Sequence, residues 1–169
     1  MNTYETILKR RSIRKFKEGT IKDEDIKMLL DAAMAAPSAR NMQPWEFYVV
    51  SNQEIMQEIR DFAPNFNFNS NLMIVVCGNT SRSLTKNNND FWIQDCSAAI
   101  QNILLTATSL GLATVWCGLY PVIERSYKIK ELLKVSEEII PLGLIHVGIP
   151  NEEKEPRTQY NENYVHFIK

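Results

Sequence analysis

The stretch that decides the fold is Asp90–Pro121, with the sequence DFWIQDCSAAIQNILLTATSLGLATVWCGLYP. From Cys96 onward it contains no charged side chain, and its apolar residues recur at helical spacing around most of a helix. Gly111 and several polar side chains interrupt the run, so it is too short for a transmembrane span. We therefore predict a helix buried on more than one side, with Asp90 as its N-cap and Gly111 as its stop. Such a helix is either a central core helix or a core helix that also forms a subunit interface.

The residues after Gly111 predict a strand that leads to a ligand-binding turn. Ala113–Trp116 is a short run of β-branched and apolar residues, which is typical of a buried strand. Cys117–Pro121 would then form a turn at the carboxyl end of that strand, where α/β sheets usually bind ligands.

Length, composition and charge limit the class of protein. A chain of 169 residues is most simply one domain, residues 1–169, and 44% hydrophobic residues are enough for a core. A net charge of −1 favours neither nucleic acid nor an anionic membrane as a partner. The N-terminal residues lack the apolar core of a signal peptide, which predicts a cytoplasmic protein.

The residues that usually carry metal, redox or dinucleotide chemistry form no recognisable motif. Three cysteines make no C-x-x-C pair, which predicts reduced thiols, and two histidines have no metal-ligand spacing. Six glycines spell neither G-x-G-x-x-G nor a phosphate loop. We expect no metal site, and any dinucleotide is not held by a Rossmann glycine loop.

The segment Arg10–Phe16, RRSIRKF, combines cations and one serine hydroxyl with the apolar Ile13 and Phe16. Guanidinium groups suit phosphate or carboxylate oxygens, and a hydroxyl adds a neutral donor. The alternation predicts an extended segment with one side held against the core. Three interpretations stay open: an anion-binding site, a solvated basic surface, or a nucleic-acid patch on a structural protein.

The segment Ala36–Phe47, APSARNMQPWEF, predicts a rigid loop, because two prolines frame small and amide-bearing residues. The amides of Asn41 and Gln43 could pair with the edge of a planar heteroaromatic group. The alternative is a turn that Asn and Pro merely stabilise.

The remaining elements follow from periodicity and polarity. Helices are predicted over residues 3–11, 20–36, 52–62 and 122–135, and strands over residues 47–50, 72–77 and 139–149. The aromatic residues Phe66 and Phe68 lie either over a pocket or in a surface connection, and Asn79–Asn89 is a polar surface loop or a lid. The last residues, Tyr164–Ile168, are too apolar to remain free, so we expect them to pair along another subunit or to pack on their own.

Three motifs in order carry a resemblance to a known family. R-R-S-I-R-x-F, A-P-S-x-x-N-x-Q-P-W-x-F and the later Trp116-Cys117-Gly118 resemble the FMN-dependent nitroreductase family, across essentially the whole chain and among its short members. The resemblance implies an α+β fold, with a central mixed β-sheet surrounded by helices. It also implies an obligate, domain-swapped homodimer in which the arm of residues 150–169 embraces the partner subunit.

The resemblance further implies where FMN would bind. Arg10–Arg14 and Arg157 would surround the phosphate, the ribityl chain and the pyrimidine edge, with Arg14 near flavin N1. Pro37, Ser38 and Asn41 would reach the cofactor from the other subunit, and the catalytic Gly118 would present its backbone N–H near N5. The implied cofactor-binding residues are Arg10, Arg11, Ser12, Arg14, Pro37, Ser38, Asn41, Gln43, Trp116, Cys117, Gly118 and Arg157.

The implied activity is that of an NAD(P)H-dependent oxidoreductase that passes hydride through flavin N5 by ping-pong kinetics. Nitroaromatics, quinones or similar flat molecules would be the acceptors, a second copy of the chain the only macromolecular partner, and neither nucleic acid nor a membrane is expected. Alternatives are a flavin-dependent reductive dehalogenase, a flavin-consuming relative, or a non-catalytic flavin-binding module. Cys117 is predicted to be structural, because no resolving cysteine is recognisable.

Overall fold

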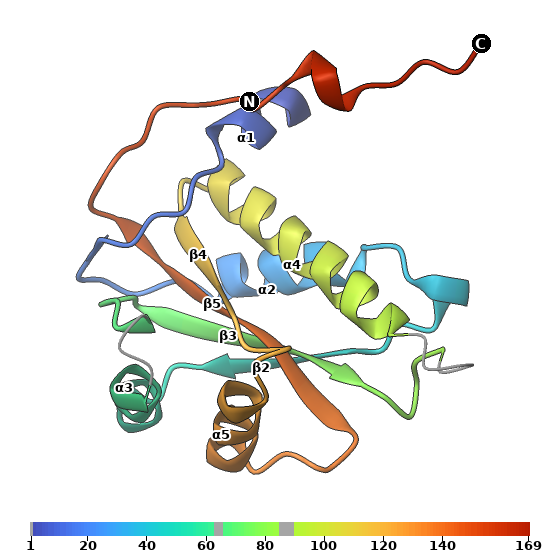
Figure 1. Cartoon of the computed structure of the whole chain (residues 1–169). Helices are drawn as coiled ribbons and strands as arrows, with labels where there is room; N and C mark the ends of the chain where they lie inside the picture. The colour runs from blue at the N-terminus through green and yellow to red at the C-terminus, as the bar shows by residue number, and fades with distance from the viewer. Residues whose placement is uncertain (1, 63–65, 85–89) are drawn as a thin grey trace.

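The computed structural model describes residues 2–62, 66–84 and 90–169. In this part of the chain, five strands form one sheet that has helices on both faces (Figure 1). Helices α2 and α4 cover one face, and α3 and α5 cover the other. The fold is therefore of the α+β class, as the sequence predicted.

The strands are β1 (Phe16–Lys17), β2 (Trp45–Val50), β3 (Leu72–Asn79), β4 (Ala113–Gly118) and β5 (Ile139–Pro150). Every ladder between them is antiparallel. The prediction of a mixed sheet is wrong in this respect, since the only parallel pairing in the described residues is an isolated bridge between Ser12 and Thr114. The connection from β3 through α4 to β4 does run between parallel strands. However, β5 lies between them and pairs with both.

The helices are α1 (Thr3–Lys9), α2 (Asp23–Met34), α3 (Gln53–Phe62), α4 (Phe91–Ser109) and α5 (Ile123–Leu133). Two short 3₁₀ turns, η1 (Ala39–Asn41) and η3 (Glu162–Tyr164), complete the described elements. All the predicted helices are present, and their ends differ from the predicted bounds by a few residues.

Helix α4 is the buried central helix that the sequence predicted. It packs against α2 and the sheet, and Gly111 ends it with a φ of +75°, a conformation that glycine adopts without strain. Asp90 occupies the N-cap position, but its side chain makes no capping hydrogen bond. The buried side chains of α4 are Trp92, Asp95, Cys96, Ala99, Ile100, Ile103, Leu104 and Ala107.

Strand β3 separates the two halves of the core, because its side chains are buried on both faces as predicted. Ile74 and Val76 face the core under α4, whereas Met73, Val75 and Cys77 belong to the core under α3 and α5. This alternation follows from the two-residue period of a strand.

Two predicted loops differ from expectation or lie partly outside the described residues. Phe66 is buried, and the ring of Phe68 packs edge-on against His146, so these aromatic rings pack on the core instead of covering a pocket, while Asn67 and Asn69 are exposed as in a surface connection. Large aromatic rings contribute most when buried, which explains the difference. Of the segment 79–89, residues 79–84 form the end of β3 and a turn, and residues 85–89 lie outside the described part.

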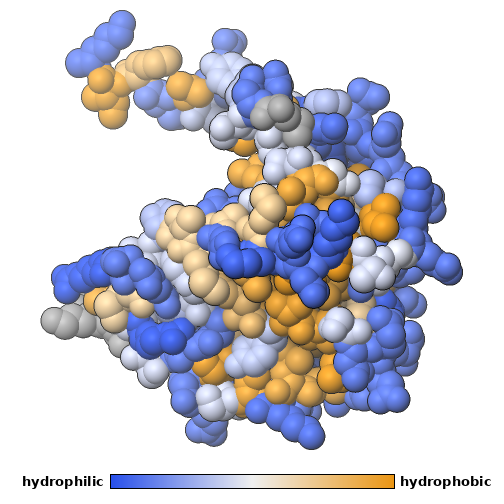
Figure 2. All heavy atoms as spheres, turned by 180° about the vertical axis from the view of Figure 1, so that it is seen from behind, coloured by the Kyte–Doolittle hydropathy of each residue, from blue (hydrophilic) through white to orange (hydrophobic). Residues whose placement is uncertain are grey.

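The C-terminal arm, residues 151–169, leaves the body after β5 and passes α1, where the Arg157 N–H donates to the Leu8 carbonyl at 3.2 Å. Beyond this contact it stands clear of the body, and Figure 2 shows its apolar end exposed. Phe167 is 84% exposed and Ile168 is 99% exposed. The apolar end of the arm thus does not pack on its own subunit. None of the helices in the described ranges combines the length and hydropathy of a membrane span.

Candidate functional site

Arginines gather where the C-terminal arm passes the end of α1. Burial, and after it the charges of Arg11 and Arg157, lower the pKa of Arg10, so the guanidinium groups of Arg11 and Arg157 lie within electrostatic range of Arg10. Among the described residues, none of the three forms an ion pair with a carboxylate. Positive charge without a counter-charge is the electrostatic requirement of an anion site. The anion-site interpretation of the segment is therefore favoured over a merely solvated surface.

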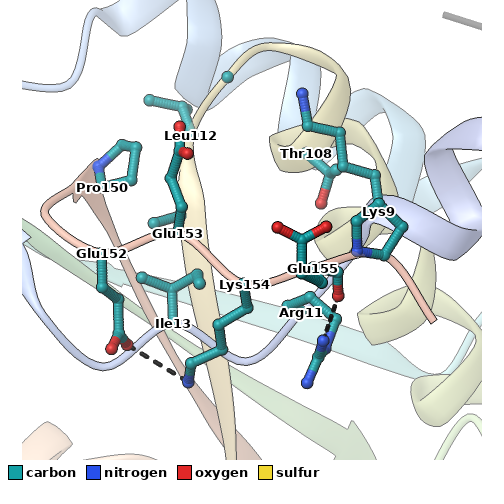
Figure 3. A pocket seen from close by; sticks show the side chains of 13 residues that line it. Lys9, Arg11, Ile13, Thr108, Leu112, Pro150, Glu152, Glu153, Lys154 and Glu155 are labelled. Atoms are coloured by element: carbon teal, nitrogen blue, oxygen red, sulfur yellow. Dashed lines mark hydrogen bonds and ion pairs between the residues drawn. The ribbon is translucent and has the colours of Figure 1, made fainter.

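The first residues of the arm hold the cationic segment in an extended conformation. The backbone N–H of Arg14 donates to the Glu152 carboxylate at 2.6 Å, and this bond lowers the pKa of Glu152. Lys154 forms an ion pair with Glu152 at 3.3 Å, drawn in Figure 3, and donates to the Ser12 carbonyl at 2.6 Å. The Arg11 guanidinium donates to the backbone carbonyl of Glu155. The arm and the segment therefore form one unit.

The inner side of the segment packs as the sequence predicted. Ile13 and Phe16 are buried, Arg14 is exposed, and the Ile13 N–H donates to the carbonyl of Thr114 on β4 at 3.0 Å. The alternation of cations with apolar residues therefore did indicate one side held against the core.

A cavity of about 440 Å³ lies between the end of α1, the end of α4 and the first residues of the arm (Figure 3). Of the predicted site residues, only Arg11 lines it. Three glutamates, Glu152, Glu153 and Glu155, also line it, and their negative charge disfavours a phosphate. This cavity is therefore not the predicted cofactor site.

The amide-rich loop, Pro37–Gln43, lies at the opposite end of α4, beside the first turns of the helix. The Gln43 N–H donates to Ser38 Oγ at 3.0 Å, and the Gln43 side-chain amide donates to Asn41 Oδ1 at 2.9 Å. Arg40, Asn41 and Gln43 have positive φ angles of 50°, 57° and 50°. Left-handed conformations are uncommon for residues other than glycine, and they occur often at ligand-binding loops.

One side chain outside this loop holds it in place. Oδ1 of Asp95, on α4, accepts the Ala39 N–H at 2.9 Å. Pro37, Asn41 and Gln43 are exposed, so they can contact a group outside their own subunit.

The end of β4 offers an open surface next to a buried thiol. Trp116 is 38% exposed, and a Cβ at Gly118 would meet no atom within 4 Å. Cys117 lies between them in sequence but belongs to the core under α3 and α5, and burial raises its pKa to about 11. Arg14 opposes this rise in the pKa, so the guanidinium of Arg14 lies within electrostatic range of the end of β4.

The indole of Trp116 rests over Gly143 of β5. A Cβ at Gly143 would lie 2.3 Å from Trp116 Nε1, so only glycine fits beneath the ring. The sequence predicted a turn at Cys117 and Gly118, but both still pair with β5, and the chain turns only after them. This pairing keeps Trp116 and Gly118 on the same face of the strand.

A single chain does not bring the two halves of the predicted site together. Asp95 contacts the amide loop, whereas Thr108 lines the cavity beside Arg11. At a rise of about 1.5 Å per residue, these positions on α4 are separated by about 20 Å. Figure 1 shows the two regions at opposite ends of the helix.

Sequence reasoning missed four residues that shape this region: Asp95, Gly143, Glu152 and Lys154. The only signal for Asp95 was an acid next to the uncharged part of a helix. For Glu152 and Lys154 the sequence showed only a polar tail. Their partners lie more than 130 residues away in the chain.

Comparison with known proteins identifies the family. The model of the nitroreductase family matches residues 7–71 and 65–149. A relative from Archaeoglobus fulgidus, named "Putative NADH dehydrogenase/NAD(P)H nitroreductase", is 42% identical over 96% of this chain and 95% of its own. A crystal structure of a protein of that name from Parabacteroides distasonis superimposes with a TM-score of 0.91 at 38% identity, covering 99% of this chain and 98% of the other. An FMN-dependent nitroreductase from Clostridium difficile gives a TM-score of 0.87 at 31% identity, covering 98% and 99%. The fold and these similarities define the class of protein: the chain belongs to the nitroreductase family.

Proposed function

We propose that this protein is an NAD(P)H-dependent flavin oxidoreductase that binds FMN and reduces nitroaromatics, quinones or similar flat acceptors. The observation that carries the proposal is the cluster of Arg10, Arg11 and Arg157, none of which forms an ion pair with a carboxylate among the described residues. The phosphate of FMN would supply a negative charge that pairs with these guanidinium groups. Similarity to an FMN-dependent nitroreductase and to an NAD(P)H nitroreductase supports the same cofactor and the same reductant.

The residues present fit the two ends of FMN. The guanidinium groups of Arg10, Arg11 and Arg157 suit the phosphate, with the hydroxyl of Ser12 as a further donor. Arg14 lies within electrostatic range of the end of β4, which suits a position near flavin N1. A cation there would stabilise the negative charge of the reduced ring.

The end of β4 fits the reacting edge of the ring. The open space above Gly118 allows a planar group to approach the backbone closely, and the indole of Trp116 lies beside it. In the proposal the Gly118 N–H donates to N5, while Cys117 contributes only its backbone, because its thiol is buried in the core. When bound, FMN would supply hydride chemistry at N5, with NAD(P)H as the reductant and the flat molecule as the acceptor.

The proposed active unit is a homodimer, because one chain separates the two sets of ligands by about 20 Å. A partner subunit would supply Pro37, Ser38, Asn41 and Gln43 to the site whose phosphate end is formed by the arginines. The exposed apolar residues of the arm would cover the partner and so join cofactor binding to assembly. In this arrangement residues 1–169 form one FMN-binding domain, and residues 150–169 form its exchanged arm.

Steady-state kinetics with purified protein test this function. NAD(P)H and acceptor should share one space over Gly118, so the double-reciprocal plots should be parallel, and oxidised acceptor should compete with NAD(P)H. Anaerobic NAD(P)H alone should bleach the flavin absorbance fully. Intersecting lines would contradict the shared space.

Other outcomes would identify the alternatives. A yellow protein that NAD(P)H does not bleach would be a flavin-binding module rather than an enzyme. Turnover only with halogenated acceptors, or loss of the flavin itself in oxygen, would indicate one of the related activities.

A further inference from the structure

Asp95 is a buried carboxylate for which the packing of α4 supplies only one partner. The residue is 5% exposed, and its Oδ1 accepts the Ala39 N–H at 2.9 Å. Its other oxygen, Oδ2, has no hydrogen-bond partner within the described residues. Burial raises the pKa of this carboxyl, and the Ala39 hydrogen bond opposes the rise. A buried acid with a single bond is costly to the fold, and a serine or an apolar residue would avoid that cost.

The hydrogen bond between Ala39 and Asp95 connects a rigid helix to a loop with a strained backbone. Asp95 stands on the most deeply buried helix of the fold, whereas Ala39 begins the 3₁₀ turn of the Pro37–Gln43 loop. Three residues of this loop hold left-handed backbone conformations, which persist only where surrounding contacts impose them. The other contacts in the loop, from Gln43 to Ser38 and to Asn41, are internal to it. They fix its shape. The Asn79 N–H donates to the Pro44 carbonyl at 2.7 Å and holds the end of the loop at β3, so Asp95 is the contact that ties the middle of the loop to α4.

We propose that Asp95 is the positioning residue that holds the Pro37–Gln43 loop at the height on α4 from which Asn41 and Gln43 reach the flavin ring of the partner subunit. This inference rests on the proposed flavin function. Asp95 acts through the backbone of Ala39 and does not touch the cofactor. The loop serves the ring rather than the phosphate, which the arginines bind about 20 Å away along α4.

Two variants remove the bond from opposite sides. Asp95→Ala removes the acceptor. Ala39→Pro removes the donor and leaves α4 intact, since proline suits the first position of a helical turn and Ser38 is already extended, as a residue before proline prefers. Each variant should weaken FMN and riboflavin equally, by at least about tenfold in dissociation constant, as expected for a lost bond to a charged group. The double variant should bind no worse than either single variant, because both remove the same interaction.

Two controls separate positioning from stability. Asp95→Asn keeps an oxygen acceptor for Ala39, so it should bind FMN within about threefold of the wild type. Ser70→Ala removes a buried hydrogen bond of similar length, 2.8 Å to His146, between residues that take no part in the proposed site. It should lower the melting temperature and leave flavin affinity unchanged.

The results distinguish this inference from the function on which it rests. If wild-type protein does not bind FMN, the proposed function fails, and the role of Asp95 fails with it. If wild-type protein binds FMN, but Asp95→Ala and Ala39→Pro bind it equally well, only the role of Asp95 is overturned. Additive losses in the double variant, or a loss of FMN affinity without a loss for riboflavin, would also overturn it.

Discussion

The two ends of α4 lie beside side chains of different chemistry. At the C-terminal end lie guanidinium groups that form no ion pair with a carboxylate among the described residues, and the first residues of the arm hold the segment that carries them. At the N-terminal end, uncharged amides are displayed on a strained loop that one buried carboxylate ties to the helix. The first end offers charge and depends on a segment that leaves the body, whereas the second offers hydrogen-bond geometry and depends on the core.

In the proposed site, the two ends of α4 suit two different parts of the flavin, the phosphate and the edge of the ring. A phosphate needs charge more than exact placement, so it tolerates ligands from an extended arm. A planar ring edge needs donors and acceptors at fixed positions, which a rigid helix supplies better. Because the helix keeps the two ends apart, the proposed function assigns them to one flavin through a second copy of the chain.

The largest effect is expected from deleting Tyr160–Lys169, which removes the exposed apolar end of the arm and keeps Arg157. Dimer affinity should fall at least about 100-fold, because buried aromatic anchors dominate interfaces, and flavin should be released at the same time. Sedimentation velocity recorded at the flavin absorbance band measures both. The matched control is Glu162→Gln, a polar change in the same arm, which should have no effect. A truncated protein that stays dimeric and yellow would contradict a shared site.

The next largest effect is expected from a change at the arginine cluster alone, near the C-terminal end of α4. Arg157→Ala should weaken FMN binding about tenfold or more, because a charge-assisted contact contributes about 1.5–3 kcal/mol. The loss should be smaller for riboflavin, which has no phosphate, whereas changes at the amide end should weaken both ligands alike. Fluorescence titration with each ligand measures the difference, and Lys169→Ala controls for the removal of a cation from the arm. Equal losses would show that Arg157 does not contact the phosphate.

A smaller effect is expected between the two ends, at the paired glycines of β4 and β5. Gly143→Ala forces the Trp116 indole to move, so it should destabilise the fold by about 1–3 kcal/mol and shift the tryptophan fluorescence. Gly118→Ala meets no atom, so it should leave the melting temperature nearly unchanged but lower turnover by several-fold, since its methyl group enters the space proposed for the ring. Thermal melts and NAD(P)H oxidation separate these outcomes. If instead Gly143→Ala lowered turnover and Gly118→Ala destabilised the fold, the flavin ring would lie over Gly143 and not over Gly118.

The smallest effect is expected at Cys117. With its pKa raised to about 11, only roughly 0.1% of the thiol is ionised at pH 8, compared with roughly a tenth at the ordinary value of 9.0. Alkylation by iodoacetamide should therefore be slow, and its rate should rise about tenfold for each pH unit up to pH 10. Cys117→Ala should retain flavin affinity and turnover within about twofold. A rapid reaction at pH 7 with loss of activity would show that the thiol takes part in the chemistry.

Local patterns in the sequence identified most elements and predicted the charged and amide-bearing residues of the candidate site. The period of the apolar residues located α4, and the glycine that ends the helix was correctly found at Gly111. The alternation around Ile13 and Phe16 predicted an extended segment against the core, which is confirmed. These signals are readable because they depend on neighbours within a few residues.

Pairings between distant residues could not be read in the same way. The mixed sheet was wrong because β5, which is last in the chain, inserts between β3 and β4. The ties of Glu152 to Arg14 and of Asp95 to Ala39 also join segments far apart in sequence. No local pattern distinguishes such a glutamate or aspartate from one that only faces solvent.

The sequence by itself therefore determined the secondary structure, the family resemblance and the residues that carry charge or amides, because each depends on local composition and spacing. Only the tertiary structure decided where those residues lie relative to one another. It placed the arginines and the amide loop at opposite ends of α4, because a helix of 19 residues is a rigid rod about 28 Å long. Chain folding cannot shorten that rod, so the distance between the two halves of the site is a property of the fold.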